Sequence, residues 1–166
     1  IDFAVTPYSV QYAGAAAAFG GASTKTDLTS GTIAPGQYFL IQEAGGATNG
    51  VVLPTPDATG TINLATGGGK VALVLGTVAI TAVSCPGDDG VSPFNPVFST
   101  IVDFVGYGSS ANCYEGAGPA PFVNSNARST IRTVSCTDTN NNSTDFSNPV
   151  TAPVARNTAT AASICP

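Results

Sequence analysis

The chain contains four cysteines but no histidine, and this combination constrains the fold more than any other feature. Without histidine and without a CxxC motif, the cysteines fit neither a zinc site nor a thioredoxin-like redox site. We therefore expect two disulfides and an oxidising, extracellular compartment. Four cysteines allow three pairings. We favour Cys85–Cys113 and Cys136–Cys165, because each bond would staple one long irregular segment.

Charged residues are rare, at 9% of the 166 residues, against about 25% in an average soluble domain. The five cations are scattered, whereas nucleic-acid binding needs clustered cations that neutralise phosphates, so we expect no nucleic-acid partner. No apolar run approaches the roughly 18 residues of a membrane span. The length suits one domain, and we predict a single domain over residues 1–166.

Short β-branched and aromatic segments alternate with turn-forming residues along most of the chain, whereas helix signals are weak. The alanine-rich run 13–18 is interrupted by Gly14 and lacks the length and caps of a helix. Segments 70–75 and 78–83 flank a Gly-Thr pair, which predicts a hairpin with a two-residue turn. Further strands are predicted at 9–13, 37–42, 51–53, 61–64, 101–105 and 129–134. This pattern predicts a β-sandwich or barrel.

A series of motifs resembles, in order, those of bacterial lamin tail domains. Residues 8–13 read YSVQYA, which is similar to the family's W-S-V-Q-Y-A, and residues 33–43 read IAPGQYFLIQE, which is similar to I-x-P-G-x-Y-x-L-V-Q-E. Residues 102–108 read VDFVGYG, and residues 111–116 read ANCYEG, as in V-D-x-V-G-Y-G and A-N-C-x-E-G. The series is completed by segments 53–60, 69–73 and 136–146 and by Pro153, Arg156 and Asn157.

The resemblance implies an all-β fold, an immunoglobulin-like β-sandwich of about 7–9 short strands. It also implies no catalysis, because lamin tail domains usually serve as binding or structural modules. In secreted bacterial proteins they often stand beside nucleases or other hydrolases.

The start of the chain departs from the family pattern. The family usually opens with a further strand, D-F-x-E-L-x-N, and then a loop before the tryptophan. Here Tyr8 replaces that tryptophan and follows residues 1–3 almost at once, so the first strand is shortened or missing. A sandwich that lacks a strand exposes unpaired backbone groups, which a second copy can fill by strand addition. The predicted assembly edge comprises Ile1, Asp2, Phe3, Ala4 and Val5.

The polar loop after Cys136 is the strongest candidate for a metal site. Oxygen-bearing side chains alternate along it and a carboxylate closes the series, which suits a hard cation such as Ca²⁺, although the spacing departs from an EF-hand. In the alternative interpretation, the same side chains form Asx-turns with neighbouring backbone N–H groups. The candidate ligands are Asp138, Asn140, Asn142 and Asp145. No cofactor is required, and Ca²⁺ is the one candidate.

Two overlapping N-x-[ST] sequons in this loop make Asn141 and Asn142 candidate glycosylation sites. The aromatic residues could also serve a carbohydrate-binding surface, although strand alternation makes core burial their default. Arg128 and Arg132, four residues apart in a strand-like segment, should point to one face. For them we expect a structural pair with Asp103 or Asp145.

Catalytic constellations are scarce, and we expect no enzyme. A chain without histidine cannot form a Ser-His-Asp or Cys-His arrangement. Nothing marks Lys25 or Lys70 for Ser-Lys catalysis, and Glu43 and Glu115 lie in segments that the resemblance already explains.

We expect a non-enzymatic extracellular structural protein that self-assembles into a surface filament or coat. Low charge leaves little repulsion between identical subunits, and the small-residue-rich opening could pack tightly against a neighbour. The expected partners are therefore further copies of the chain, with carbohydrate as a second candidate. The alternative function is a binding or adhesion module of a larger, hydrolase-associated secreted protein, in which the missing strand marks a fragment boundary.

Overall fold

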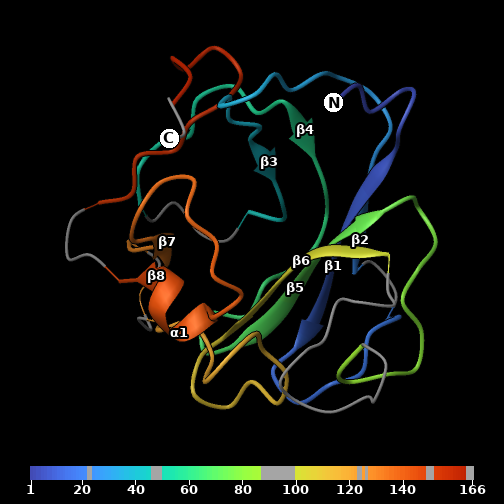
Figure 1. The fold of residues 1–166 in the computed structure, drawn as a ribbon, viewed down its shortest axis with the longest axis vertical. Coiled ribbons are helices and arrows are strands. Elements are labelled where there is room, and N and C mark those ends of the chain that lie inside the picture. Colours follow the sequence, from blue (N-terminus) through green and yellow to red (C-terminus); the bar gives the residue numbers. More distant parts are fainter. Residues whose placement is uncertain are drawn as a thin grey trace.

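The computed structural model describes residues 1–21, 24–45, 50–86, 100–122, 125, 127–148 and 152–163. Figure 1 shows that these residues form strands and long irregular segments with almost no helix. The largest element is a four-stranded sheet in the order β2-β1-β5-β6, antiparallel throughout. Its strands are β1 (Tyr8–Gly14), β2 (Lys25–Leu28), β5 (Gly69–Leu75) and β6 (Ile101–Tyr107).

Two short strand pairs complete the architecture. β3 (Ile41–Gln42) pairs in parallel with β4 (Ala58–Thr59), and β7 (Ile131–Arg132) pairs antiparallel with β8 (Phe146–Ser147). The single turn of helix α1 (Asn142–Asp145) leads into β8. The all-β class is therefore confirmed. No helix in the described ranges is long and apolar enough to cross a membrane.

Strand alternation gives the four-stranded sheet two different faces. Gln11 lies opposite Ala72, and Ala72 lies opposite Phe104, so these three side chains share one face. We call it the closed face. Tyr12 lies opposite Val71, and Val71 lies opposite Val105, on the other face. We call it the groove face.

The main hydrophobic core covers the closed face. Phe19, from the segment after β1, packs at 6.1 Å between ring centroids against Phe104 of β6. The Cys85–Cys113 disulfide, with a Cα–Cα distance of 5.1 Å, joins the same cluster and confirms the first predicted pairing. The buried cluster consists of Ala13, Phe19, Ala72, Val74, Cys85, Ile101, Phe104 and Cys113.

The second predicted pairing, Cys136–Cys165, stays a prediction. Cys136 is not a free thiol. Its predicted partner Cys165 lies outside the described residues.

The predicted hairpin of 70–75 with 78–83 is wrong. β5 pairs with β1 and β6, and segment 78–83 forms no strand. The Gln11 side chain takes the place of a strand partner: its Nε2 donates to the Val78 carbonyl, and its Oε1 accepts from the Ile80 N–H. Phe19 then exchanges backbone hydrogen bonds with Val83 and Ala82. A buried side-chain amide can satisfy backbone groups that an alternating pattern would assign to a ladder.

Other strand predictions were partly correct. β1, β5 and β6 contain their predicted segments, whereas only Ile41–Gln42 of 37–42 and Ile131–Arg132 of 129–134 are strand. Segments 51–53 and 61–64 are irregular. The sequence analysis missed β2, where buried Thr26 and Leu28 alternate with Lys25 and Asp27.

The predicted assembly edge at Ile1, Asp2, Phe3, Ala4 and Val5 is not an unpaired edge, and this part of the prediction is corrected. Ile1 and Ile33 exchange hydrogen bonds, and the Phe3 N–H donates to the Gly31 carbonyl. The Asp2 carbonyl accepts from the N–H groups of Val5 and Thr6. The Phe3 ring is buried and packs edge-on against Phe39. Aromatic burial thus holds this segment against the chain's own residues 31–33.

Candidate functional site

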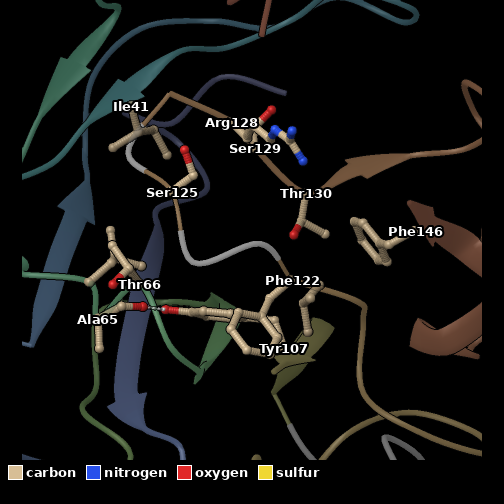
Figure 2. A pocket seen from close by; sticks show the side chains of 12 residues that line it. Ile41, Ala65, Thr66, Tyr107, Phe122, Ser125, Arg128, Ser129, Thr130 and Phe146 are labelled. Atoms are coloured by element: carbon tan, nitrogen blue, oxygen red, sulfur yellow. Dashed lines mark hydrogen bonds between the residues drawn. The ribbon is translucent and has the colours of Figure 1, made fainter. Parts of the chain in front are cut away.

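An open groove of about 690 Å³ lies on the groove face of the sheet, in the size range of small-ligand sites. Val105 and Tyr107 of β6 form part of its wall. Figure 2 shows Phe122 beside Tyr107, Phe146 across the groove, and Ile41 on the opposite side. Irregular segments supply the remaining lining, namely Leu64, Ala65, Thr66, Ser125, Arg128, Ser129 and Thr130.

Two tyrosines fix the groove wall to the sheet. The Tyr107 hydroxyl donates to the Ala65 carbonyl at 2.7 Å, and the Ala65 N–H donates to the Tyr12 hydroxyl at 3.0 Å (Figure 2 shows the first bond). Burial raises the pKa of the Tyr107 hydroxyl, and nearby Tyr12 raises it further. Tyr107 therefore remains a neutral donor at physiological pH.

The polar groups at the groove are unevenly partnered. Thr130 Oγ1 donates to the Pro121 carbonyl. In contrast, the buried Ser129 Oγ has no hydrogen-bond partner among the described residues. The exposed Arg128 side chain likewise makes no ion pair or hydrogen bond within that part of the chain. The expected structural pairing of Arg128 with Asp103 or Asp145 is therefore absent from the described contacts.

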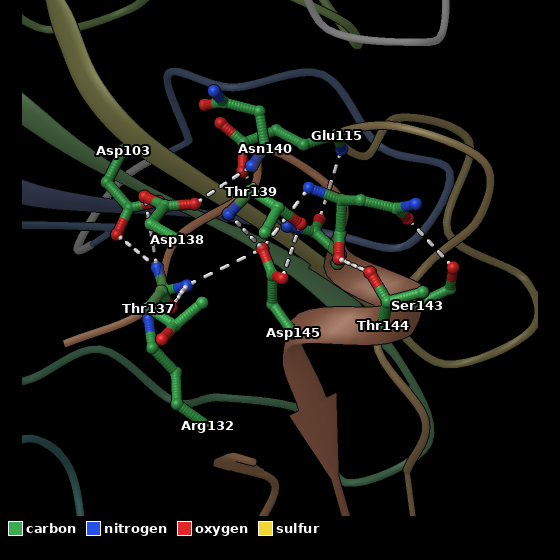
Figure 3. Close-up of polar contacts among 12 residues, drawn as sticks. Asp103, Glu115, Arg132, Thr137, Asp138, Thr139, Asn140, Ser143, Thr144 and Asp145 are labelled. Carbon is green, nitrogen blue, oxygen red and sulfur yellow. Dashed lines mark hydrogen bonds and ion pairs between the residues drawn. The ribbon is translucent and has the colours of Figure 1, made fainter. Parts of the chain in front are cut away.

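The same expectation is confirmed for Arg132, which stands at the centre of a polar cluster (Figure 3). Its guanidinium lies 2.9 Å from the Asp103 carboxylate, 3.4 Å from Asp138 and 3.7 Å from Asp145. It also stacks 4.7 Å from the Phe146 ring centroid. One cation thus compensates three carboxylates and holds the 137–145 loop against β6.

Asn142, a predicted calcium ligand, is buried, and its side-chain amide makes four hydrogen bonds. Its Oδ1 accepts from the Gly106 and Glu115 N–H groups, at 2.8 and 3.1 Å. Its Nδ2 donates to the Phe104 carbonyl and to Glu115 Oε2, both at 3.0 Å. The amide thereby takes the role of a neighbouring strand along the outer edge of β6. The sequence carries no signal for this role, because the contacts join residues about 30 positions apart.

Glu115 is buried beside this amide without a cation in hydrogen-bond contact. Burial raises its pKa to about 7, and the negative charges of Asp103 and Asp138 act in the same direction. The hydrogen bond from Asn142 and the charge of Arg132 partly oppose this shift. Burial also raises the pKa of Asp103, despite its contact with Arg132.

Of the remaining predicted ligands, Asp138 forms an Asx-turn, as the alternative interpretation expects, and Asp145 accepts from backbone N–H groups earlier in the loop. Asp138 Oδ1 accepts from the Asn140 N–H, and the Asp145 carboxylate accepts from the N–H groups of Thr139 and Asn141. These bonds lower the pKa of Asp145 although burial opposes the shift. Among the described residues, no group of three or more His, Cys, Asp or Glu is placed to hold a metal ion. A calcium ion at Asp138, Asn140, Asn142 and Asp145 stays a prediction. It would compete with the backbone N–H groups for the carboxylate oxygens.

The two sequons differ in accessibility. Asn142 is 1% exposed and uses Nδ2 in two hydrogen bonds, so a sugar on that nitrogen would displace at least one of them. Asn141 is half-buried, and its Oδ1 accepts from the Ala117 N–H and the Ser143 hydroxyl, whereas its Nδ2 makes no hydrogen bond among the described residues. Glycosylation therefore stays a prediction that the geometry favours at Asn141 over Asn142.

Lys70 is the most unusual titratable residue of the closed face. Its side chain is fully buried, and Nζ donates to the Ala17 and Ser84 carbonyls and to Asn112 Oδ1, at 2.6–2.7 Å. Burial lowers its pKa to about 8. Since Ser84 and Asn112 adjoin the disulfide cysteines, the ammonium and the disulfide fasten the same two segments. The alternation of Lys70 with Ala72 and Val74 could have signalled an inward position.

Comparisons of the chain with protein-family models, curated proteins and solved structures find no match.

Proposed function

We propose that this protein is a non-enzymatic extracellular structural subunit with a lamin-tail-like, immunoglobulin-type sandwich that associates with copies of itself into a filament or coat. The observation that carries the proposal is the exposed aliphatic surface. Val52 is 93% exposed and stands between Val51 and Leu53, which are 54% and 43% exposed. Three consecutive exposed aliphatic residues are unfavourable in an isolated soluble domain unless they serve a contact.

The charge distribution supports close approach of identical subunits. Of the five cations, Lys70 is buried, Lys25 pairs with Asp27, and Arg132 faces three carboxylates. Arg156 lies 4.0 Å over the Tyr38 ring. Charged residues make up only 9% of the chain and the net charge is -5, so electrostatic repulsion between copies is modest.

The mode of association differs from the strand addition expected at the chain's start. Ile1 and Phe3 already pair with residues 31–33, and the outer edge of β6 is covered by Asn142 and Ala120. We therefore propose contacts through apolar side chains. The disulfide supports the extracellular part of the proposal.

Sedimentation velocity across a concentration series, with electron microscopy of the same samples, tests self-association. We expect concentration-dependent oligomers or filaments, and Val52→Asp should abolish them because it places a charge in the apolar contact. Asn63→Asp, an equal charge change at another exposed residue, is the matched control and should assemble like the wild type. A wild type that stays monomeric at every concentration, or equal assembly by Val52→Asp, contradicts the proposal.

A second candidate function is a binding module of a larger secreted protein, which the groove of Figure 2 favours. Concave, mostly apolar sites with a few polar groups are typical of ligand binding. A catalytic domain encoded in frame beside this segment would favour the module over the free subunit.

A further inference from the structure

We propose that the groove binds a small amphipathic anion, with its apolar body among the aromatic side chains and its carboxylate at Arg128 and Ser129. The inference is independent of self-association, and it gives the second candidate function a ligand chemistry.

The apolar part of the site is large enough for such a body. Tyr107, Phe122 and Phe146 surround a groove of about 690 Å³, within the roughly 300–1,000 Å³ of small-ligand sites. Ile41 and Val105 extend the apolar wall. Burial of hydrocarbon against these side chains supplies a driving force of about 0.8 kcal/mol per CH₂ group.

The charge at the groove selects an anion. The Arg128 side chain is exposed and lacks an ion pair or hydrogen bond within the described residues, whereas Lys25, Lys70, Arg132 and Arg156 each have side-chain contacts there. None of the described lining residues is acidic. In a chain of net charge -5, a cation at an apolar groove that has no side-chain partner in the described part of the chain is complementary to an anionic head group.

A second polar group supports the same orientation. Ser129 adjoins Arg128, and its buried Oγ has no partner among the described residues. A buried hydroxyl without a partner costs free energy, which a ligand oxygen that accepts its proton would recover. Arg128 and Ser129 together offer charged and neutral donors for one carboxylate.

Calorimetric titration of the whole chain tests the proposal with octanoate, 1-octanol and octylammonium, which share one hydrocarbon chain. The titrations use a protein concentration that sedimentation shows to be monomeric. We expect saturable one-to-one binding of octanoate that is about tenfold tighter than that of octanol, because one charge-assisted hydrogen bond separates the two ligands. Octylammonium should bind most weakly.

Two variants locate the site. Arg128→Gln should reduce octanoate affinity about tenfold, to the level of octanol, and leave octanol binding unchanged. Ala65→Phe, at an exposed residue of the groove wall, should weaken both ligands by filling the groove. Arg156→Gln and Ala161→Phe are the matched controls outside the groove and should bind like the wild type.

Three results would overturn the inference: no saturable binding of octanoate, equal affinity for octanoate and octanol, or unchanged affinity in both groove variants. Because all samples are monomeric, any of these results leaves the self-association proposal standing.

Discussion

The two faces of the four-stranded sheet are formed by the same strands, but one is covered by the main hydrophobic core and the other borders an open groove. On the closed face, the Lys70 ammonium, the Gln11 amide and the Cys85–Cys113 disulfide tie irregular segments onto the strands. On the groove face, Tyr107 fixes one segment, while Arg132 holds the 137–145 loop at the border. The difference teaches that polar contacts to strands occur on both faces, and that the face is closed where the main hydrophobic cluster also packs on it, whereas the other face keeps a groove.

The largest expected effect comes from the β6 edge that the two faces share. Asn142→Ala removes four hydrogen bonds and takes away the side-chain acceptor of the Gly106 and Glu115 N–H groups. We expect the free energy of unfolding to fall by about 4 kcal/mol. Urea unfolding measures it, with exposed Ser143→Ala as the control within about 0.5 kcal/mol of wild type. A loss as small as that of the control would mean that Asn142 does not organise this edge.

Lys70→Met should destabilise the closed face and cause the next largest fall in the free energy of unfolding. The substitution keeps most of the hydrocarbon chain but removes the buried ammonium that donates to three partly buried oxygen acceptors. We expect a loss of about 3 kcal/mol in the free energy of unfolding. Lys25→Met, at a partly exposed ion pair, should change it by less than about 1 kcal/mol. Equal effects of the two variants would remove the distinction between the buried and the surface lysine.

Glu115→Gln should change the stability of the protein by an amount that depends on pH. The folded-state pKa of Glu115 is raised from 4.5 to about 7, so the folded state keeps a proton that the unfolded state has released within this window. Wild-type stability therefore falls as pH rises from 4.5 to about 7. Glutamine cannot ionise and still accepts a hydrogen bond through its side-chain oxygen.

The gain from Glu115→Gln should be near zero at the acidic end of that window and reach about 3 kcal/mol above its upper end. Thermal unfolding of both proteins across this pH range measures the difference in stability between them. A difference in stability that is constant with pH, or that shrinks as pH rises, would contradict a raised pKa of the buried Glu115 carboxyl group.

The smallest effect is expected on the groove face. Tyr107→Phe keeps the aromatic ring but loses the bond to the Ala65 carbonyl, at a cost of about 1 kcal/mol. Urea unfolding measures this loss, and a cost equal to that of Lys70→Met would show that the groove face is fastened as firmly as the closed face.

The predictable parts of this protein depend on short-range pattern. Alternation located β1, β5 and β6; the cysteine count with the absence of histidine predicted disulfides, and the long irregular segment between Cys85 and Cys113 favoured that pairing. Arg128 and Arg132 were expected to pair with Asp103 or Asp145, and the expectation is confirmed for Arg132. Each inference used residue type or local sequence pattern, which do not depend on tertiary contacts.

The remaining features depend on which distant segments meet. Sequence pattern gave Asn142 an exposed ligand role, and only its contact with Phe104, Gly106 and Glu115 made it part of the sheet edge. Likewise, Gln11 replaced a predicted hairpin partner, and residues 31–33 covered the predicted assembly edge at residues 1–5.

The sequence by itself determined an all-β chain with a disulfide, few charges and no histidine-based catalysis, because composition and alternation act locally. Only the tertiary structure decided which face of the sheet is closed, where the groove lies and that Arg128 stands there without a described partner. The physical reason is that a buried polar group must find a hydrogen-bond partner, and that partner is selected by packing between segments far apart in the chain.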